Sequence, residues 1–140
     1  MAGSTLWCMH DYGADYWPVW SEQHSGALDS TRLPKELWHY LKSRWTNEPM
    51  VHICGHWTWP GEEGRPRAVT VVTNCQSFEL FLDKRSLGAR KCENPMRWEV
   101  VYEPSALKAV GSCGGRKLTD ELRPAGPPAK REVKANPHIL

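Results

Sequence analysis

The sequence predicts a mainly β fold, in which a β-sandwich of immunoglobulin size follows a single strand–loop–helix segment. Three observations predict it. From residue 51 onward, apolar and polar residues alternate in short runs between turn residues, as they do in antiparallel strands. Just before that point, apolar residues recur at helical spacing. The chain has 140 residues, enough for one ordinary domain but too few for a complete (β/α)₈ barrel, which needs about 250 residues.

The helix is expected over residues 34–45. Pro34 suits the first helical turn, where its missing N–H is no loss, and Pro49 marks the end. Four apolar residues share one face of this helix: Leu37, Trp38, Leu41 and Trp45. We therefore expect Trp38 and Trp45 to be buried in the core.

The segment before the helix is expected to hold one strand and one long loop. Residues 4–9 are apolar enough for a buried strand, and about twenty residues without a regular period follow them. The loop contains four aromatic residues, which argue against disorder: Tyr12, Tyr16, Trp17 and Trp20. A single strand–helix unit cannot cover both of its own faces, so it needs neighbours that this sequence does not contain.

Seven short strands are expected in the second part of the chain. Their apolar residues alternate over these ranges: 69–74, 78–83, 86–88, 98–102, 107–111, 118–122 and 129–133. Gly114-Gly115 is typical of a two-residue hairpin turn, and Asp83-Lys84 occupies a similar position. The sequence thus divides into residues 1–50, a strand–loop–helix unit, and residues 51–140, a β-sandwich.

Composition and charge exclude several classes of partner. Lys+Arg 18 against Asp+Glu 16 leaves a net charge of +2, without the basic stripe that nucleic-acid binding requires. No apolar run is long enough to span a bilayer, and no signal peptide is visible at the N-terminus. We therefore expect neither a nucleic-acid nor a membrane partner, while the compartment stays open.

The spacing of cysteine and histidine residues bears on disulfides and metal ligands. The chain has 5 cysteines without a CxxC pair, which favours reduced thiols over a disulfide framework. His52, Cys54 and His56 would share one face of a strand, and two histidines with a thiolate can bind zinc. However, Gly55 interrupts that strand, and no nearby residue completes four ligands. The sequence therefore predicts no metal ion and no cofactor.

Asp11, Asp15 and Trp7 are the residues that could contact a substrate. Glycoside hydrolysis needs two carboxyl groups on opposite sides of the scissile bond, but one sequence does not determine their separation. The structural alternative for Asp11 is that it orders the loop through backbone hydrogen bonds. Trp7 ends the expected strand, where its ring could line a sugar pocket or simply pack.

Several stretches resemble β-galactosidase-like members of glycoside hydrolase family 2. Residues 50–61, MVHICGHWTWPG, are similar to the junction that follows the catalytic barrel in this family. Residues 72–82 and residues 120–126, DELRPAG, look like the immunoglobulin-like domain after it. Upstream, residues 3–12 are similar to the last barrel strand, and residues 25–29 to the approach to the final helix.

The resemblance implies that the chain is a C-terminal part of such an enzyme. Residues 1–50 would be the terminal βα unit of a truncated (β/α)₈ barrel, and residues 51–140 an immunoglobulin-like domain. The parent would hydrolyse O-glycosidic bonds in a β-galactoside-like carbohydrate, but the family's catalytic glutamates lie on barrel strands that are absent here. No catalytic residue is therefore expected. Trp7 matches a sugar-contacting position and Asp11 an acidic position in the same motif, so both are candidate substrate-binding residues.

The sequence departs from the family pattern at Lys84, at Gly55 and at Ser105, which replaces a usual glycine, and a second function class stays open. Lys84 replaces a usual glycine in the hairpin turn, where a positive φ would be unfavourable, and Gly55 replaces a usual proline. The alternative function is a stand-alone carbohydrate-binding or protein-interaction module that associates through exposed aromatic residues.

Overall fold

The computed structural model describes residues 5–16, 19–92 and 95–126. They form one short helix and nine strands. The hairpin β1 (Tyr12–Tyr16) and β2 (Val19–Gln23) precedes the helix α1 (Glu36–Trp45). Seven strands follow: β3 (Val51–Cys54), β4 (Pro66–Thr73), β5 (Ser77–Leu82), β6 (Arg85–Lys91), β7 (Met96–Val101), β8 (Leu107–Cys113) and β9 (Arg116–Leu122).

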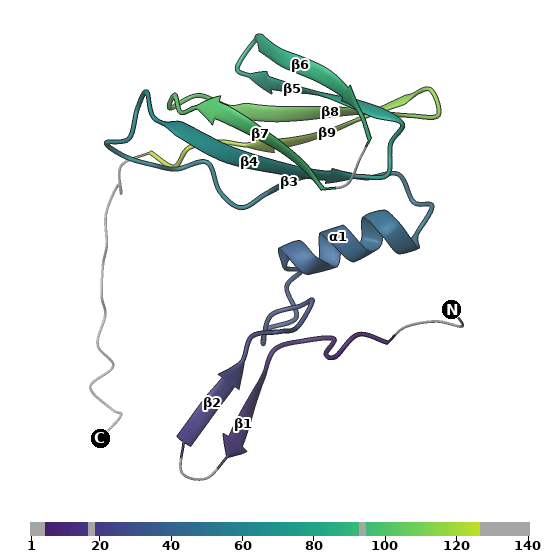
Figure 1. Cartoon of the computed structure of the whole chain (residues 1–140), viewed down its shortest axis with the longest axis vertical. Helices are drawn as coiled ribbons and strands as arrows, with labels where there is room; N and C mark the ends of the chain where they lie inside the picture. The colour runs from purple at the N-terminus through teal and green to yellow at the C-terminus, as the bar shows by residue number, and fades with distance from the viewer. Residues whose placement is uncertain (1–4, 17–18, 93–94, 127–140) are drawn as a thin grey trace, which may run out of the picture.

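The seven later strands form two antiparallel sheets with a sandwich-like arrangement. One sheet has the order β3-β4-β7 and the other the order β6-β5-β8-β9. Figure 1 shows α1 on the side of the three-stranded sheet, between the sandwich and the β1–β2 hairpin. The mainly β fold with one short helix is thus confirmed.

The core lies between the two sheets because their strands alternate. Every second residue of β5 is buried, namely Phe78, Leu80 and Leu82, and β7 shows the same alternation. Such side chains from five strands, together with Trp57 and Tyr102, form one apolar cluster. The period of two in the sequence therefore identified most of the core correctly.

The hairpin turns follow from residues that tolerate a positive φ. Gly114 and Gly115 have φ of 55° and 83°, as a type I′ turn between β8 and β9 requires. In the turn between β5 and β6, Asp83 takes the left-handed conformation with φ of 53°, and Lys84 does not. Aspartate is one of the few residues that adopt this conformation readily, so the turn forms without glycine.

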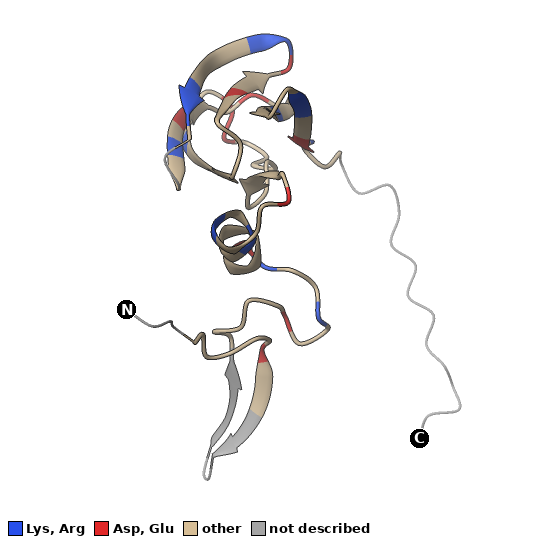
Figure 2. Ribbon diagram, turned by 90° about the vertical axis from the view of Figure 1, so that its right-hand side faces the viewer, with Lys and Arg blue, Asp and Glu red and all other residues tan. Residues whose placement is uncertain are grey.

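Basic side chains mark the outer edge of the four-stranded sheet. Arg85 begins β6, and Arg90 and Lys91 end it, so both ends of this exposed edge strand are basic (Figure 2). Charged residues on an edge strand oppose pairing with a strand of another chain.

The expected helix is confirmed to within two residues, but the expected burial of its tryptophans is wrong. Trp45 is 62% exposed and Trp38 is only half-buried. Within α1 only Ser43 is buried. The helix contacts the sandwich through β4, and neither β1 nor β2 makes a comparable contact with it. A helical apolar stripe predicts a covered face, but not the element that covers it.

No helix in the described residues is both long and apolar enough to cross a membrane.

The expected strand over residues 4–9 is not found in residues 5–9. The segment forms an isolated parallel bridge from His10 to Leu28 instead. A parallel strand depends on neighbouring strands for its backbone hydrogen bonds, and the described chain offers only this short contact. The loop that was expected to be irregular contains the β1–β2 hairpin. Trp17 and the expected strand at residues 129–133 lie outside the described residues.

The expectation of reduced thiols is wrong for two cysteines, because Cys75 and Cys113 form a disulfide. The pairing of β5 with β8 brings them together from positions 38 residues apart. A Cβ added at Gly111 would lie 2.8 Å from the Cys75 sulfur, so glycine makes room for the bridge. Spacing rules missed this pair because strand pairing, not proximity in sequence, places it.

Replacing both Cys75 and Cys113 with alanine is expected to lower the free energy of unfolding by about 2–4 kcal/mol, because the unfolded chain loses a cross-link. Urea unfolding measures this loss, and Cys8→Ala is the control for removing a free thiol. Thiol titration of the unreduced, denatured chain should detect Cys8, Cys54 and Cys92 alone. Detection of all 5 cysteines as thiols would contradict the bridge.

Candidate functional site

Asp11 is buried, and its carboxylate organises the segment before the helix. One oxygen accepts the Gly26 N–H at 2.8 Å, and the Lys35 ammonium binds both oxygens at 2.9 Å. Lys35 also donates to the carbonyl of His24 at 2.7 Å. The Lys35 ammonium, assisted by the Gly26 N–H, holds the pKa of Asp11 below its ordinary value of 3.8. Asp11 therefore has the loop-ordering role that the sequence offered as its structural alternative.

Close backbone approach reinforces this arrangement. The Asp11 N–H donates to the Leu28 carbonyl, and the Leu28 N–H donates to the Met9 carbonyl, both at 2.9 Å. A Cβ at Gly26 would lie 2.3 Å from the backbone of His10 and Asp11, so only glycine fits there. The residues around Asp11 and those around Gly26 thus form one ordered unit.

Trp7 lies on the exposed side of this unit. Its side chain is 80% exposed, and Met9 on the same segment is 69% exposed. An exposed indole ring can stack on the apolar face of a sugar. Among the described residues, Trp7 makes no ring contact with Trp45, the other strongly exposed tryptophan, so the two form no aromatic cluster.

Trp7 and Asp11 have different surroundings in the structure. The Asp11 side chain forms an ion pair with Lys35, whereas the Trp7 side chain is exposed to solvent. Asp15 belongs to β1, and its side chain lies outside the described part of the structure. A substrate-binding role for Trp7 and Asp11 stays a prediction.

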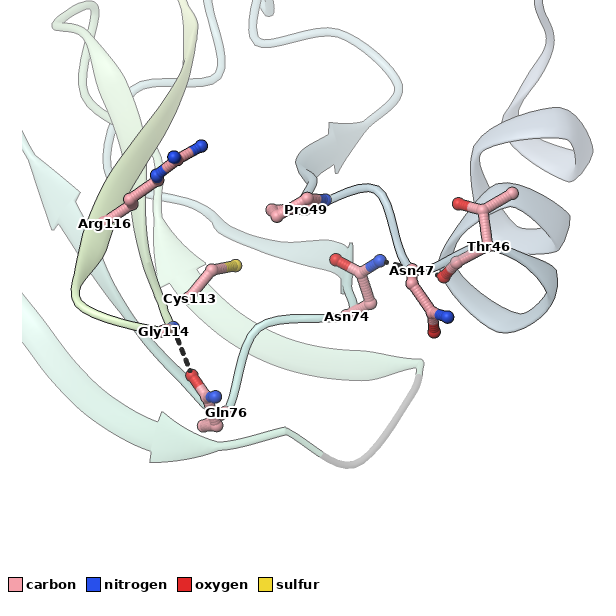
Figure 3. Close-up of a pocket in the computed structure, with 8 residues that line it drawn as sticks. All are labelled: Thr46, Asn47, Pro49, Asn74, Gln76, Cys113, Gly114 and Arg116. Atoms are coloured by element: carbon pink, nitrogen blue, oxygen red, sulfur yellow. Dashed lines mark hydrogen bonds between the residues drawn. The ribbon is translucent and has the colours of Figure 1, made fainter.

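A polar cavity of about 460 Å³ lies elsewhere, beside the disulfide. Figure 3 shows its lining: Thr46, Asn47, Pro49, Asn74, Gln76, Cys113, Gly114 and Arg116. Two of its amide groups hold the surrounding backbone. Asn74 donates to the carbonyls of Thr46 and Glu48, and Gln76 accepts the Gly114 N–H. The lining contains no aromatic ring for stacking on a sugar.

A group of ionisable side chains, which we call the helix–sheet cluster, joins α1 to the sandwich. It consists of Glu36, His52, Cys54 and Asp120. His52 Nε2 lies 3.0 Å from a Glu36 oxygen, and its Nδ1 lies 3.2 Å from an Asp120 oxygen. The second Glu36 oxygen accepts the Gly55 N–H at 2.8 Å. The cluster therefore links the first turn of α1 with β3 and β9.

Burial and the two carboxylates together shift the pKa values of His52 and Cys54 in the helix–sheet cluster. Burial disfavours the charged form of His52, but Asp120 and Glu36 outweigh this effect and raise the pKa of the imidazole. Burial, followed by the neighbouring Glu36, raises the pKa of the Cys54 thiol to about 12.

The ligand set in the structure differs from that of the H-x-C-x-H pattern. His56 does not join His52 and Cys54: its Nδ1 accepts the Thr58 N–H, and its ring lies 4.4 Å from that of Trp59. Glu36 takes its place, and the ligand atoms of Glu36, His52 and Cys54 lie within 4.8 Å of one another. No local pattern contains Glu36, because the helix brings it from sixteen residues away.

Replacing Lys35 with methionine is expected to raise the pKa of Asp11 toward 3.8, because the ammonium that stabilises its charge is lost. In the unmodified chain the depressed pKa means that the ion pair stabilises the fold above about pH 4. This contribution is lost as the pH falls through the folded-state pKa. Carboxyl NMR titration measures the pKa, and thermal unfolding between pH 3 and 7 measures the stability. The exposed Glu99→Gln variant controls for general charge loss, and equal Asp11 titration with and without Lys35 would refute the coupling.

Comparison with known proteins identifies relatives for this chain. Residues 64–119 match the family described as a domain of unknown function, DUF4982. The β-galactosidase BoGH2A of Bacteroides ovatus is 27% identical over an alignment that covers 100% of this chain and 17% of that protein.

Solved structures of glycosidases also resemble this chain. A β-glycosidase from Bacteroides vulgatus superposes with a TM-score of 0.77 and 35% identity, covering 85% of this chain and 16% of the other. A β-glucuronidase from glycoside hydrolase family 2 superposes with a TM-score of 0.68 and 32% identity, covering 77% and 12%. This chain spans less than a fifth of the length of each of these relatives. It is a homologue of a short C-terminal segment of glycoside hydrolase family 2 glycosidases and contains a DUF4982 domain.

Proposed function

We propose that this chain acts as a non-catalytic part of a glycoside hydrolase family 2 enzyme. Residues 51–140 are a structural immunoglobulin-like domain in this proposal. Residues 1–50 are the last strand-and-helix unit of a catalytic (β/α)₈ barrel, whose other units lie outside this sequence. The substrate class is a β-linked glycoside, and the names of the relatives leave galactoside and glucuronide open.

The exposed apolar surface of residues 1–50 carries the proposal. Along this part of the chain, Trp7, Met9, Leu33 and Trp45 are each more than 60% exposed. Elements that adjoined residues 1–50 in a longer protein could cover these large apolar side chains. Barrel strands and helices adjoining residues 1–50 would bury this surface. The contacts of Asp11 with Gly26 and Lys35 would hold Trp7 at the end of the last strand, where barrel enzymes bind substrate.

A second candidate is a stand-alone carbohydrate-binding module, and the 80% exposure of Trp7 favours it. In this case the ring would be available to a sugar without any barrel. Titration of the purified chain with methyl β-galactoside and methyl β-glucuronide, followed by tryptophan fluorescence, separates the two candidates. Saturable binding that disappears in Trp7→Ala would favour the stand-alone carbohydrate-binding module. If the chain is instead a non-catalytic part of a larger enzyme, no change in tryptophan fluorescence is expected.

The proposal is tested by exchanging the homologous segment of Bacteroides ovatus BoGH2A for this chain. The chimera should hydrolyse an aryl β-galactoside, because the acceptor protein supplies the rest of the barrel. Trp7→Ala in the chimera should lower kcat/KM at least about tenfold, since one wall of the sugar pocket is lost; tenfold corresponds to about 1.4 kcal/mol.

Two control variants make this experiment specific. Trp7→Phe keeps an aromatic face and should recover most of the activity, and Val101→Ala removes an exposed apolar side chain on β7 and should have no effect. Equal kcat/KM for the chimera and its Trp7→Ala variant would rule out a substrate contact by Trp7. Turnover of the aryl glycoside by the isolated chain, abolished by one substitution within it, would overturn the non-catalytic role.

A further inference from the structure

Three different ligand types converge in the helix–sheet cluster. Glu36 offers a carboxylate oxygen from α1, and His52 and Cys54 offer a ring nitrogen and a sulfur from β3. These ligand atoms all lie within 4.8 Å of one another. His52 and Cys54 are two residues apart on one strand, so their side chains project from the same face of β3. The helix then places Glu36 opposite that face.

This ligand set selects among metal ions. Magnesium and calcium prefer oxygen ligands alone, whereas zinc accepts thiolate, imidazole and carboxylate together. A tetrahedral zinc ion with ordinary bond lengths holds its ligand atoms about 3.3 to 3.8 Å apart. The His52 nitrogen and the Glu36 oxygen lie 3.0 Å apart, and all three ligand atoms lie within 4.8 Å of one another. Zinc binding therefore requires side-chain rotations that bring the three atoms to these separations.

Contacts outside the three ligands orient them. Asp120 binds Nδ1 of His52 at 3.2 Å, which leaves Nε2 directed toward Glu36 and available for a metal ion. The ring of His39 stacks on that of His52 with centroids 3.6 Å apart and fixes the plane of the imidazole. A carboxylate behind a metal-binding histidine is the usual arrangement in zinc sites. The Gly55 N–H similarly holds one oxygen of Glu36 and leaves the other facing His52.

Charge and access also suit a divalent cation. The Glu36 carboxylate and a Cys54 thiolate would together neutralise the two positive charges of zinc, and neutral His52 would complete three protein ligands. Binding would release the thiol proton, and any proton on His52 Nε2, to solvent. The Glu36 side chain is 53% exposed, so the ion can enter from solvent and a water molecule can take the fourth position.

We propose that Glu36, His52 and Cys54 form a zinc site that joins α1 to the β-sandwich, with Asp120 as the residue that positions His52. The site lies between the helix and the edges of both sheets, because Asp120 also accepts the Ile53 N–H at 2.7 Å. Zinc binding would therefore stabilise the attachment of the helix to the sandwich. The zinc site is independent of the proposed role in a glycoside hydrolase.

The full chain, purified without a polyhistidine tag, tests the site with zinc chloride and cobalt chloride as probes. Isothermal titration should show one zinc per chain, and the melting temperature should rise with zinc concentration, because the ion binds the folded state. Cobalt should give an absorption band from sulfur-to-metal charge transfer, which reports a thiolate ligand. Absence of saturable zinc binding by the folded chain would overturn the proposal.

Variants identify the ligands. Cys54→Ser and His52→Ala should weaken zinc binding at least about a hundredfold and abolish the cobalt–sulfur band. Asp120→Asn should weaken it about 10- to 100-fold, since the residue acts through His52. Glu36→Gln keeps an acceptor for the Gly55 N–H, so it tests the carboxylate ligand in a variant that is expected to fold.

Two matched controls test one other thiol and one other histidine. Cys8→Ser removes another free cysteine, and His56→Ala removes the histidine that follows Cys54 by two residues and lies outside the cluster. Both variants should bind zinc as tightly as the unmodified chain. Undiminished zinc affinity in Cys54→Ser, or loss of binding in His56→Ala with a normal melting curve, would show that the ion binds elsewhere and would overturn the assignment.

Discussion

Burial of one face of each sheet against the other is the constraint on which the rest of the structure depends. In β5 the side chains of Phe78, Leu80 and Leu82 enter the core, and their neighbours in sequence face outward. Complete burial of one such side chain contributes about 1.5–3 kcal/mol. Because the period is two, a shift of one residue would turn all three toward solvent, so burial determines the strand register. The register of β5 against β8 in turn brings Cys75 and Cys113 together, and that of β8 against β9 determines the position of Asp120.

Asp120 connects the two sheets and the helix through polar contacts. β3 and β9 are edge strands of different sheets, and the Asp120 carboxylate on β9 accepts the Ile53 N–H of β3. The same carboxylate binds His52, which also binds Glu36 on α1. Edge strands leave backbone groups without a ladder partner, and this side chain satisfies one of them. The helix position thus depends on the same register that aligns the core.

The segment before the helix depends on a different balance of forces. Its described part is held by the Asp11–Lys35 ion pair and by close approach of backbone at Gly26, not by an apolar core. Large apolar side chains such as Trp7 consequently stay exposed. The chain is homologous to a short segment of much longer glycosidases, and in the proposed enzyme neighbouring elements would cover these side chains.

The sequence by itself determined the local features of this protein. Alternation located β4, β5, β7 and β8, a run of apolar residues at helical spacing located α1 to within two residues, and short motifs revealed the relationship to glycoside hydrolases. Each of these signals lies within a few neighbouring residues. Only the tertiary structure decided the Cys75–Cys113 disulfide, the exposure of Trp45 and the meeting of Glu36 with His52. These features depend on strand pairing and helix packing between residues distant in sequence, and no local pattern records which distant residue becomes a neighbour.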